Sequence, residues 1–170
     1  WSAYILGKRE SRRLMGDVIL NVDHLNEDKQ FPDGAAPTGW DNDLHVASPK
    51  YNKGFEGDAF ISDAKHGYFP AFKENRPFWV PYRCLYSRNI DNLFMAGRCI
   101  SVTHDALGAV RVMRSCGTQG EIVGMAASVC KEFNTNPRGV YKKHLTDLQK
   151  RMRKGVGKVD GSTIPYSNQG

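Results

Sequence analysis

This sequence lacks several patterns that would assign a protein to a class. No apolar run approaches the roughly 20 residues that a membrane-spanning helix needs, and no signal peptide begins the chain, so we expect no membrane segment. No Gly-x-Gly-x-x-Gly follows a strand and no phosphate-loop lysine is present, so both common nucleotide-binding loops are missing. The four cysteines form no Cys-x-x-Cys pair and lack a nearby histidine pair, so we expect free thiols and no metal. None of this indicates a cellular compartment.

The composition is that of a folded domain. Of the 170 residues, 40% are hydrophobic and 25% are charged, which is enough apolar material for one core. The net charge of +6 comes mainly from the last third of the chain, and it is weak evidence for nucleic acid binding.

Residues 92–133 are the stretch around which the chain is organised. The apolar run 93–96, stopped by Gly97, is typical of a strand buried on both faces. From Ile122 onward apolar residues recur at helical spacing, so we expect one face of a helix to pack on a sheet. The residues of that face are Ile122, Ala126, Val129, Cys130 and Phe133.

A second face of this helix consists of small residues: Gly117, Gly120, Gly124 and Ser128. Glycine in a helix costs about 0.5–1 kcal/mol relative to alanine, so the glycines indicate close approach of another group. A cofactor held at the free N–H groups of a glycine-opened helix is one interpretation, and tight packing on a strand is the other. Under both, Gly120→Leu should overpack the segment.

Five motifs, in order, resemble the C-terminal portion of FAD-dependent oxidoreductases of the glutathione-reductase and fumarate-reductase-like superfamily. Asn-Leu-Phe-Met-Ala-Gly-Arg at 92–98, the arginine of Ala-Val-Arg-Val-Met at 109–113 and the glycine pattern at 117–127 resemble its flavin-binding segment. Arg-Glu-Ser-Arg-Arg-Leu-Met-Gly-Asp at 9–17 and Pro-Tyr-Arg-Cys-Leu-Tyr at 81–86 also resemble the family.

The resemblance implies an oxidoreductase that uses FAD and acts on a small molecule. The family's N-terminal dinucleotide-binding strand, glycine loop and helix are not in this sequence, so the chain is expected to be a fragment that binds FAD weakly or not at all. Unpaired strand edges and apolar surface would then favour self-association.

The same resemblance assigns roles to individual residues. Flavin-binding roles fall to Ala96, Gly97, Arg98, Gly117, Thr118, Gln119 and Gly120. Catalytic roles fall to His104, Arg111 and Arg83. His104 is an acid–base candidate, with the cap of a helical turn as the alternative, and Arg111 is the candidate charge partner near the ring or the substrate. Cys99 and Cys116 flank this segment, which leaves a redox dithiol open as an alternative to inert thiols.

The expected fold class is α+β, as a fragment of an α/β flavoprotein. A mixed or antiparallel sheet portion is followed by the buried strand, the glycine-opened helix and a C-terminal amphipathic helix. The corresponding divisions are a substrate-side β-rich region at 1–91, the flavin-binding strand-loop-helix at 92–133, the amphipathic helix at 134–157 and a flexible tail at 158–170.

Within the first region, strands are expected at Trp1–Leu6, Asp17–Val22, Trp40–Val46 and Phe78–Leu85, with a surface loop over 23–40. Pro81 places the last of these strands at an edge or a bulge. His45 should lie on the opposite face from Leu44 and Val46, and it is expected to be structural. Weak strand signal also marks 59–61, and the charged run 8–13 is either a solvated turn or part of the substrate side.

The C-terminal helix is expected to begin at Asn136-Pro137 and to carry Tyr141, Leu145, Leu148 and Met152 on one face. Its other face is basic, which favours a solvated surface and leaves phosphate or nucleic acid binding as an alternative. Two other functions therefore stay open: a small basic module for nucleic acid or polysaccharide, and a purely structural piece of a larger protein.

Overall fold

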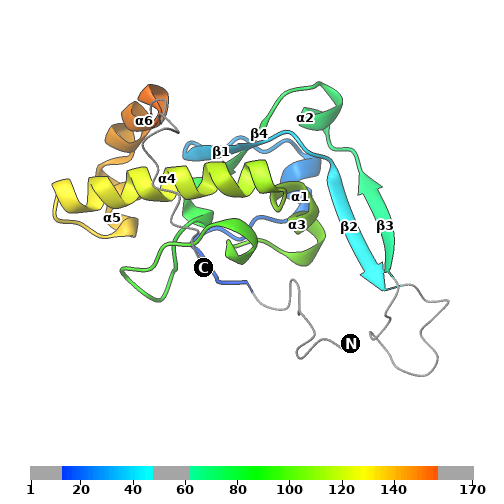
Figure 1. Ribbon diagram of the computed structural model, residues 1–170, viewed down its shortest axis with the longest axis horizontal. Coiled ribbons are helices and arrows are strands. Elements are labelled where there is room, and N and C mark those ends of the chain that lie inside the picture. Colours follow the sequence, from blue (N-terminus) through cyan, green and yellow to red (C-terminus); the bar gives the residue numbers. More distant parts are fainter. Residues whose placement is uncertain (1–12, 48–61, 157–170) are drawn as a thin grey trace, which may run out of the picture.

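The computed structural model describes residues 13–47 and 62–156. It confirms the α+β class: two small antiparallel sheets accompany helices that run through the second half of the chain (Figure 1). The strands are β1 (Gly34–Thr38), β2 (Asn42–Ala47), β3 (Ser62–Gly67) and β4 (Phe78–Pro81). The α-helices are α1 (Val22–Asn26), α2 (Pro70–Lys73), α3 (His104–Val110), α4 (Met113–Glu132), α5 (Pro137–Lys143) and α6 (Leu145–Lys154). Short 3₁₀ helices are η2 (Tyr82–Cys84) and η3 (Gly97–Cys99).

Each sheet has two strands. β1 pairs with β4, with a register shift between Gly34 and Ala36, and β2 pairs with β3 from Asn42 opposite Gly67 to Ala47 opposite Ser62. The strand predicted around Trp40–Val46 is confirmed as β2, and His45 on it is exposed. The strand expected at Phe78–Leu85 was wrong in its second half, because β4 ends at Pro81, which has no N–H to donate, and η2 follows. The edge position expected for Pro81 is confirmed, since β4 pairs only with β1 in the described part of the chain.

α4 is the long central helix, and it packs against β1, α5, α6 and η3 (Figure 1). α5 and α6 lie toward one end of it and the β2–β3 hairpin lies beyond the other. The predicted apolar face is confirmed at three positions, since Ile122, Ala126 and Val129 are at most 4% exposed. Phe133 lies after the helix and is 40% exposed, so it does not belong to the buried face.

The C-terminal helix begins as predicted and then divides. The Asn136 side chain accepts a hydrogen bond from Gly139 N at 2.8 Å, and Pro137 is the first helical residue of α5. The backbone leaves the helical region at His144, where ψ is 21°, so the expected single helix is two helices. Leu148 of α6 is fully buried, which fixes α6 against the core.

Two expected strands are single bridges instead. The run 93–96 makes an isolated antiparallel bridge between Tyr86 and Phe94, and the backbone then turns at Gly97, where φ is +71°. The glycine starts η3, so a ladder cannot continue. In the run 17–22 only Leu20 bridges in parallel to Val102, and Asn21 caps α1 through His24 N.

The region 23–40 is not a continuous loop, because it holds most of α1 and all of β1. Turn-forming residues dominate its composition, but cross-strand pairing with β4 makes Gly34–Thr38 a strand. The strand expected at 1–6, most of the charged run 8–13 and the weak strand signal at 59–61 lie outside the described residues.

Candidate functional site

Gln119 connects the two halves of the flavin-like segment. Its side chain is fully buried; Oε1 accepts a hydrogen bond from Gly97 N at 2.8 Å, and Nε2 donates to Val110 O at 3.0 Å. A residue of α4 therefore holds the start of η3 against the end of α3. Among the residues given flavin roles, the structure brings Gly97 and Gln119 into direct contact, and Arg98 follows in η3 with an exposed side chain.

The small-residue face of α4 is open to solvent. Apart from its chain neighbours and the nearby backbone of α4, a Cβ added at Gly117, Gly120 or Gly124 would meet no atom of the described residues within 4 Å. Tight packing on a neighbouring strand of the described chain is therefore not the reason for these glycines, and the overpacking expected for Gly120→Leu was wrong for the chain alone. The face is free for a group that does not belong to the described residues.

The glycines do not open the helix. α4 begins at Met113 after the extended Val112, so Gly117 and Gly120 lie in its second turn, where N–H groups bond back to carbonyls four residues earlier. The donors left over by helix geometry are those of residues 113–115. The anion-accepting end of the helix is thus one turn earlier than the glycine spacing indicated.

Arg111 and His104 stand at opposite ends of α3. His104 is the first helical residue and is exposed, whereas the Arg111 side chain at the C-cap is only 10% exposed. They are seven positions apart along the helix, which places them about 10 Å apart along its axis. Arg111 Nη2 donates to Asp43 O at 2.9 Å and lies 3.8 Å from Asp43 Oδ2, so its guanidinium is directed to the base of the β2–β3 hairpin.

Arg83 is engaged elsewhere. The Arg83 side chain donates to the Asp33 carboxylate from Nε at 2.9 Å and from Nη2 at 2.8 Å, and the Arg83 backbone N–H donates to the same carboxylate at 3.0 Å. The Asp33 side chain is fully buried. The hydrogen bonds to Asp33 raise the pKa of Arg83. The guanidinium also lies over the Tyr141 ring at 4.7 Å, so its contacts link η2, α5 and the turn before β1.

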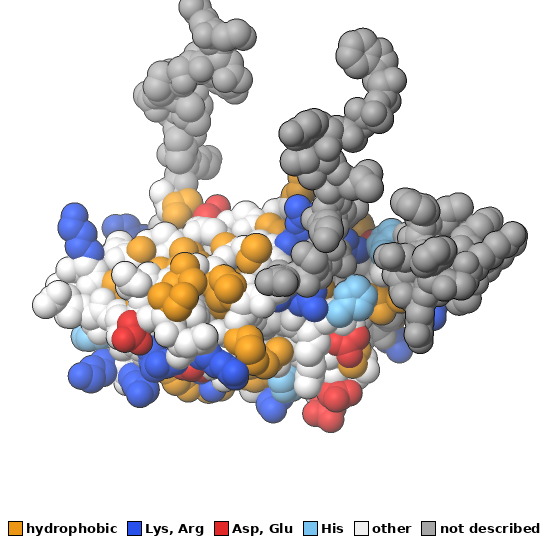
Figure 2. Space-filling view, turned by 90° about the horizontal axis from the view of Figure 1, so that it is seen from below, with side chains coloured by type: hydrophobic (Ala, Val, Ile, Leu, Met, Phe, Trp, Pro, Cys, Tyr) orange, Lys and Arg blue, Asp and Glu red, His pale blue; other side chains and the backbone are white. Residues whose placement is uncertain are grey.

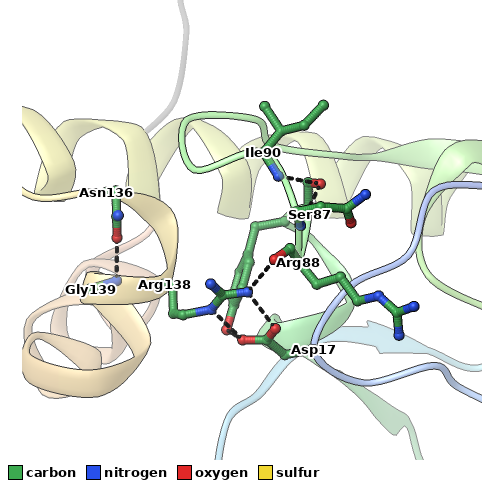
Figure 3. A network of polar contacts seen from close by, with 9 residues as sticks. Asp17, Ser87, Arg88, Ile90, Asn136, Arg138 and Gly139 are labelled. Atoms are coloured by element: carbon green, nitrogen blue, oxygen red, sulfur yellow. Dashed lines mark hydrogen bonds and ion pairs between the residues drawn. The ribbon is translucent and has the colours of Figure 1, made fainter.

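A second bidentate arginine fastens α5 to the start of the described chain (Figure 3). Arg138 donates to the two carboxylate oxygens of Asp17 at 2.7 and 2.9 Å and to Arg88 O at 2.7 Å. Tyr86 donates its hydroxyl to the same carboxylate at 2.7 Å. Burial and the neighbouring Asp17 charge raise the pKa of Tyr86, while the Arg138 hydrogen bond lowers that of Asp17. This network is structural.

A cluster of ionisable residues lies at the β2–β3 hairpin, and of its members sequence reasoning singled out His45 alone. His66 Nδ1 is 2.5 Å from Asp41 Oδ2, and Asp41 is only 7% exposed. Beside them His45 Nε2 lies 3.1 Å from Asp43 Oδ1. The hydrogen bond to Asp41 raises the pKa of His66. Because Asp41 and His66 are distant in sequence and meet only through strand pairing, no local motif reveals them.

An open groove of about 540 Å³ lies on another side of α4, between β1, β4 and α6. Trp79, Met125 and Met152 line it, and Thr118 is the one residue with a predicted flavin role that reaches it. Figure 2 shows a face of the molecule with exposed hydrophobic side chains near its centre and lysines and arginines distributed around them.

The basic face of α6 is partly neutralised by the chain's own carboxylates. Arg151 pairs with Glu132 of α4, and Lys150 lies 3.4 Å from Asp147. Such pairs on exposed helices are typical of a solvated surface.

The thiols are free, and they differ in exposure. Cys84 is buried, which raises its pKa to about 12, and burial also raises the pKa of the half-buried Cys116. Cys99 is exposed. Within residues 13–47 and 62–156, no three His, Cys, Asp or Glu side chains gather in a way that could hold a metal ion, and no helix there is long and apolar enough to cross a membrane.

The described chain is α+β, with an open glycine face on its central helix next to a glycine–arginine turn that Gln119 holds in place. The sequence matches the family described as FAD dependent oxidoreductase over residues 1–152, and the chain belongs to this family. Comparison with curated proteins and with solved structures found no further match.

The residues present fit a flavin. The glycine face of α4 is exposed, and a Cβ built at Gly117 or Gly120 would meet no other described residue within 4 Å, so another group could approach the helix backbone there. The exposed Arg98 supplies a cation beside it, and the first turn of α4 supplies N–H donors.

Proposed function

We propose that this chain is the C-terminal part of an FAD-dependent oxidoreductase and contributes the flavin-ring side of the cofactor site together with part of the substrate pocket. The observation that carries the proposal is the solvent-open glycine face of α4 beside the Gly97–Gln119 clamp. Each exposed glycine lowers the stability of this 20-residue helix by up to about 1 kcal/mol relative to alanine. Close approach of a bound group to the helix backbone would explain why glycines occupy these positions.

The residues have distinct tasks in this proposal. Ala96, Gly97 and Arg98 face the ribityl and pyrophosphate region, where the guanidinium offsets phosphate charge. The first turn of α4 turns its free N–H groups and positive dipole end toward the pyrimidine edge, while Gly117 and Gly120 allow the approach. Thr118 and Gln119 belong to the same surface, and Gln119 acts by holding Gly97. When bound, FAD accepts and returns hydride, and the protein supplies position and electrostatics.

Arg111 and His104 are proposed to face the substrate. Arg111 lies within hydrogen-bond distance of the hairpin base, so it is oriented before any substrate arrives. His104 at the exposed end of α3 is placed to donate to or accept from a substrate oxygen. Arg83 was the third catalytic candidate. Its bidentate pair with Asp33 and its contact with the Tyr141 ring favour a structural role for it instead.

The adenine end of FAD is proposed to be held by a separate dinucleotide-binding half. Affinity for a dinucleotide is summed along its length while the cost of immobilising it is met once, so half a site binds poorly. We therefore expect weak or no FAD binding by these 170 residues alone, and self-association through unpaired strand edges and exposed apolar surface.

Titration of FAD into the purified chain tests the proposal, with flavin fluorescence and native mass as readouts. We expect no stoichiometric complex with the chain alone and a yellow, FAD-containing complex once the dinucleotide-binding half of the full-length protein is present. Gly120→Leu should abolish that complex, whereas Lys143→Leu on the exposed face of α5 should leave it intact. A colourless full-length protein, or Gly120→Leu with unchanged FAD content, contradicts the proposal.

A further inference from the structure

The groove of about 540 Å³ between α4, α6 and the β1–β4 sheet has apolar walls. Its larger apolar side chains are those of Pro37, Trp79, Ile122, Met125 and Met152. Trp79 is 42% exposed, although it stands in this apolar wall. Tryptophan and methionine are enriched where proteins bind apolar partners, because tryptophan gives a large contact area and methionine adapts its shape. The groove is therefore a candidate docking surface.

The size of the groove fits a short segment of chain rather than a domain. Its volume lies in the range of roughly 300–1,000 Å³ that encloses a drug-sized molecule, which corresponds to about two or three side chains. The polar residues on the same walls, which can hydrogen-bond a peptide backbone, are Thr118, Glu121, Gln149 and Arg153. A segment with a few neighbouring apolar side chains meets both conditions.

The helix α6 ends at the edge of this groove. Its C-cap residue, Gly155, has a φ of +72°, which turns the chain out of the helix, and the Gly155 N–H donates to Arg151 O at 2.9 Å. Gly155 lines the groove, and Val156 lines a smaller hollow that shares Met125 and Gly155 with it. The chain therefore passes into residues 157–170 from the edge of the groove itself.

The sequence that follows contains one apolar run, Ile164-Pro165-Tyr166. Proline fixes its own φ and favours an extended conformation of the residue before it, so the sequence predicts an extended backbone for this run. At about 3.3 Å per residue, Ile164 can lie up to about 26 Å from Val156, which is further than a groove of this volume requires. The run has both the composition and the reach to fill the groove.

Charge favours the same arrangement. Arg153 lines the groove, and Arg151 and Lys154 line the adjoining hollow. Asp160 is the acidic residue of the segment 157–170, and it comes before the apolar run. Ion pairs on a protein surface contribute little to stability, so the apolar contacts carry the docking and the charges favour its direction.

We propose that residues 157–170 fold back over the groove and that the apolar run 164–166 fills it, packing on Trp79 and Met152. A segment that begins at the edge of the groove has an effective concentration there of about millimolar, whatever the concentration of the chain. A second copy of the chain would instead have to meet the full entropic cost of association. The inference stands apart from the proposed flavin function, because it concerns only contacts within the chain.

The methyl groups of the five methionines report on the groove in ¹H–¹³C spectra of the 170-residue chain. A docked Tyr166 ring should shift the methyl signal of at least one of Met125 and Met152, so Tyr166→Ala should move that signal. The methyl signal of Met113, which is 92% exposed and does not line the groove, should stay in place. Ser167→Ala, at a polar neighbour in the same segment, is the matched control and should move none of these signals. Unchanged signals of both groove methionines in Tyr166→Ala overturn the docking.

A photo-crosslink tests which molecule supplies the segment. With benzoylphenylalanine in place of Ile164 in the 170-residue chain, irradiation should join position 164 to Trp79, Met125 or Met152. In an equal mixture of ¹⁵N-labelled and unlabelled chains, each crosslinked pair of peptides should carry the label on both peptides or on neither. Pairs with the label on one peptide only would show that a second copy fills the groove, which overturns docking within the chain. Crosslinks confined to residues outside the groove overturn it as well.

Discussion

Gly97 N donates a hydrogen bond to the buried Gln119 Oε1 at 2.8 Å, although 22 residues separate the two in sequence. The same amide group, through Nε2, donates to Val110 O. One side chain thus satisfies a turn amide and a helix-end carbonyl, and it sets where the glycine–arginine turn lies relative to α4.

Replacing Gln119 with Leu should lower the free energy of unfolding by about 1–3 kcal/mol, because both backbone groups lose a buried partner. Urea unfolding followed by circular dichroism measures it. Thr118→Ala is the control, since the Thr118 hydroxyl bonds only to Arg114 O in its own helix. Equal stability of Gln119→Leu and the parent would show that the clamp is not a structural requirement.

Two glycines should respond in opposite directions to alanine. At Gly108 a Cβ would lie 2.4 Å from Asp43 O and 2.6 Å from Asn42 Oδ1, so Gly108→Ala should destabilise the chain by about 1–3 kcal/mol through overpacking. At Gly120 nothing lies within 4 Å, so Gly120→Ala should stabilise the isolated chain by about 0.5–1 kcal/mol. Thermal unfolding of the two variants checks both signs, and loss of stability in Gly120→Ala would contradict the open face.

The Asp33–Arg83 pair should matter more than its surface counterparts. Asp33→Asn removes a fully buried carboxylate that holds three N–H groups, and we expect a loss of about 2–3 kcal/mol. The expected loss of stability is smaller than for a fully buried ion pair, because the Arg83 side chain is 22% exposed to solvent. Asp147→Asn, whose partner Lys150 is 66% exposed, should change the free energy of unfolding by less than about 0.5 kcal/mol. Chemical denaturation that ranks the two variants the other way would argue against a structural role for Arg83.

The contribution of Asp17 to stability should depend on pH. The Arg138 hydrogen bond lowers the pKa of Asp17 below its usual 3.8, so the folded state favours the carboxylate. A lowered pKa gives stability that is fully present above the unfolded value and is lost as the pH falls through the folded value. The difference in unfolding free energy between the parent and Arg138→Gln should therefore be constant from pH 7 to about 5 and shrink below pH 3.8. Arg138→Lys keeps the positive charge but cannot donate two parallel hydrogen bonds, so it should retain part of the stability that Arg138→Gln loses. A free-energy difference between parent and Arg138→Gln that grows as the pH falls would contradict a lowered pKa of Asp17.

Much of the fold could be predicted from local pattern. The apolar spacing at Ile122, Ala126 and Val129, the Asn136-Pro137 start of a helix and the limit that Pro81 sets on β4 are properties of neighbouring residues, and the structure confirms each of them. The family could be identified as well, because its motifs are short and ordered along the chain.

Local pattern failed where pairing with distant residues decides the structure. The run 93–96 is apolar enough for a strand, yet a strand exists only with neighbours, and within the described chain it has one bridge to Tyr86. Gly34–Thr38 reads as a turn, yet pairing with β4 makes it β1. The start of α4 also differs from the glycine-opened start that was predicted. The helix begins at Met113 after the extended N-cap residue Val112, and the glycines lie further along it.

The candidate site divides in the same way. By itself the sequence determined the family, and it predicted a flavin-binding segment at Gly97, Arg98 and the α4 glycines, because each of these residue types is recognisable without its spatial neighbours. Only the tertiary structure decided that Arg83 is committed to Asp33, that Arg111 is directed to the hairpin, and that Asp41 orients His66. The physical reason is that hydrogen bonds and ion pairs act over about 3 Å, and which groups come within that distance is set by strand register and helix packing rather than by separation along the chain.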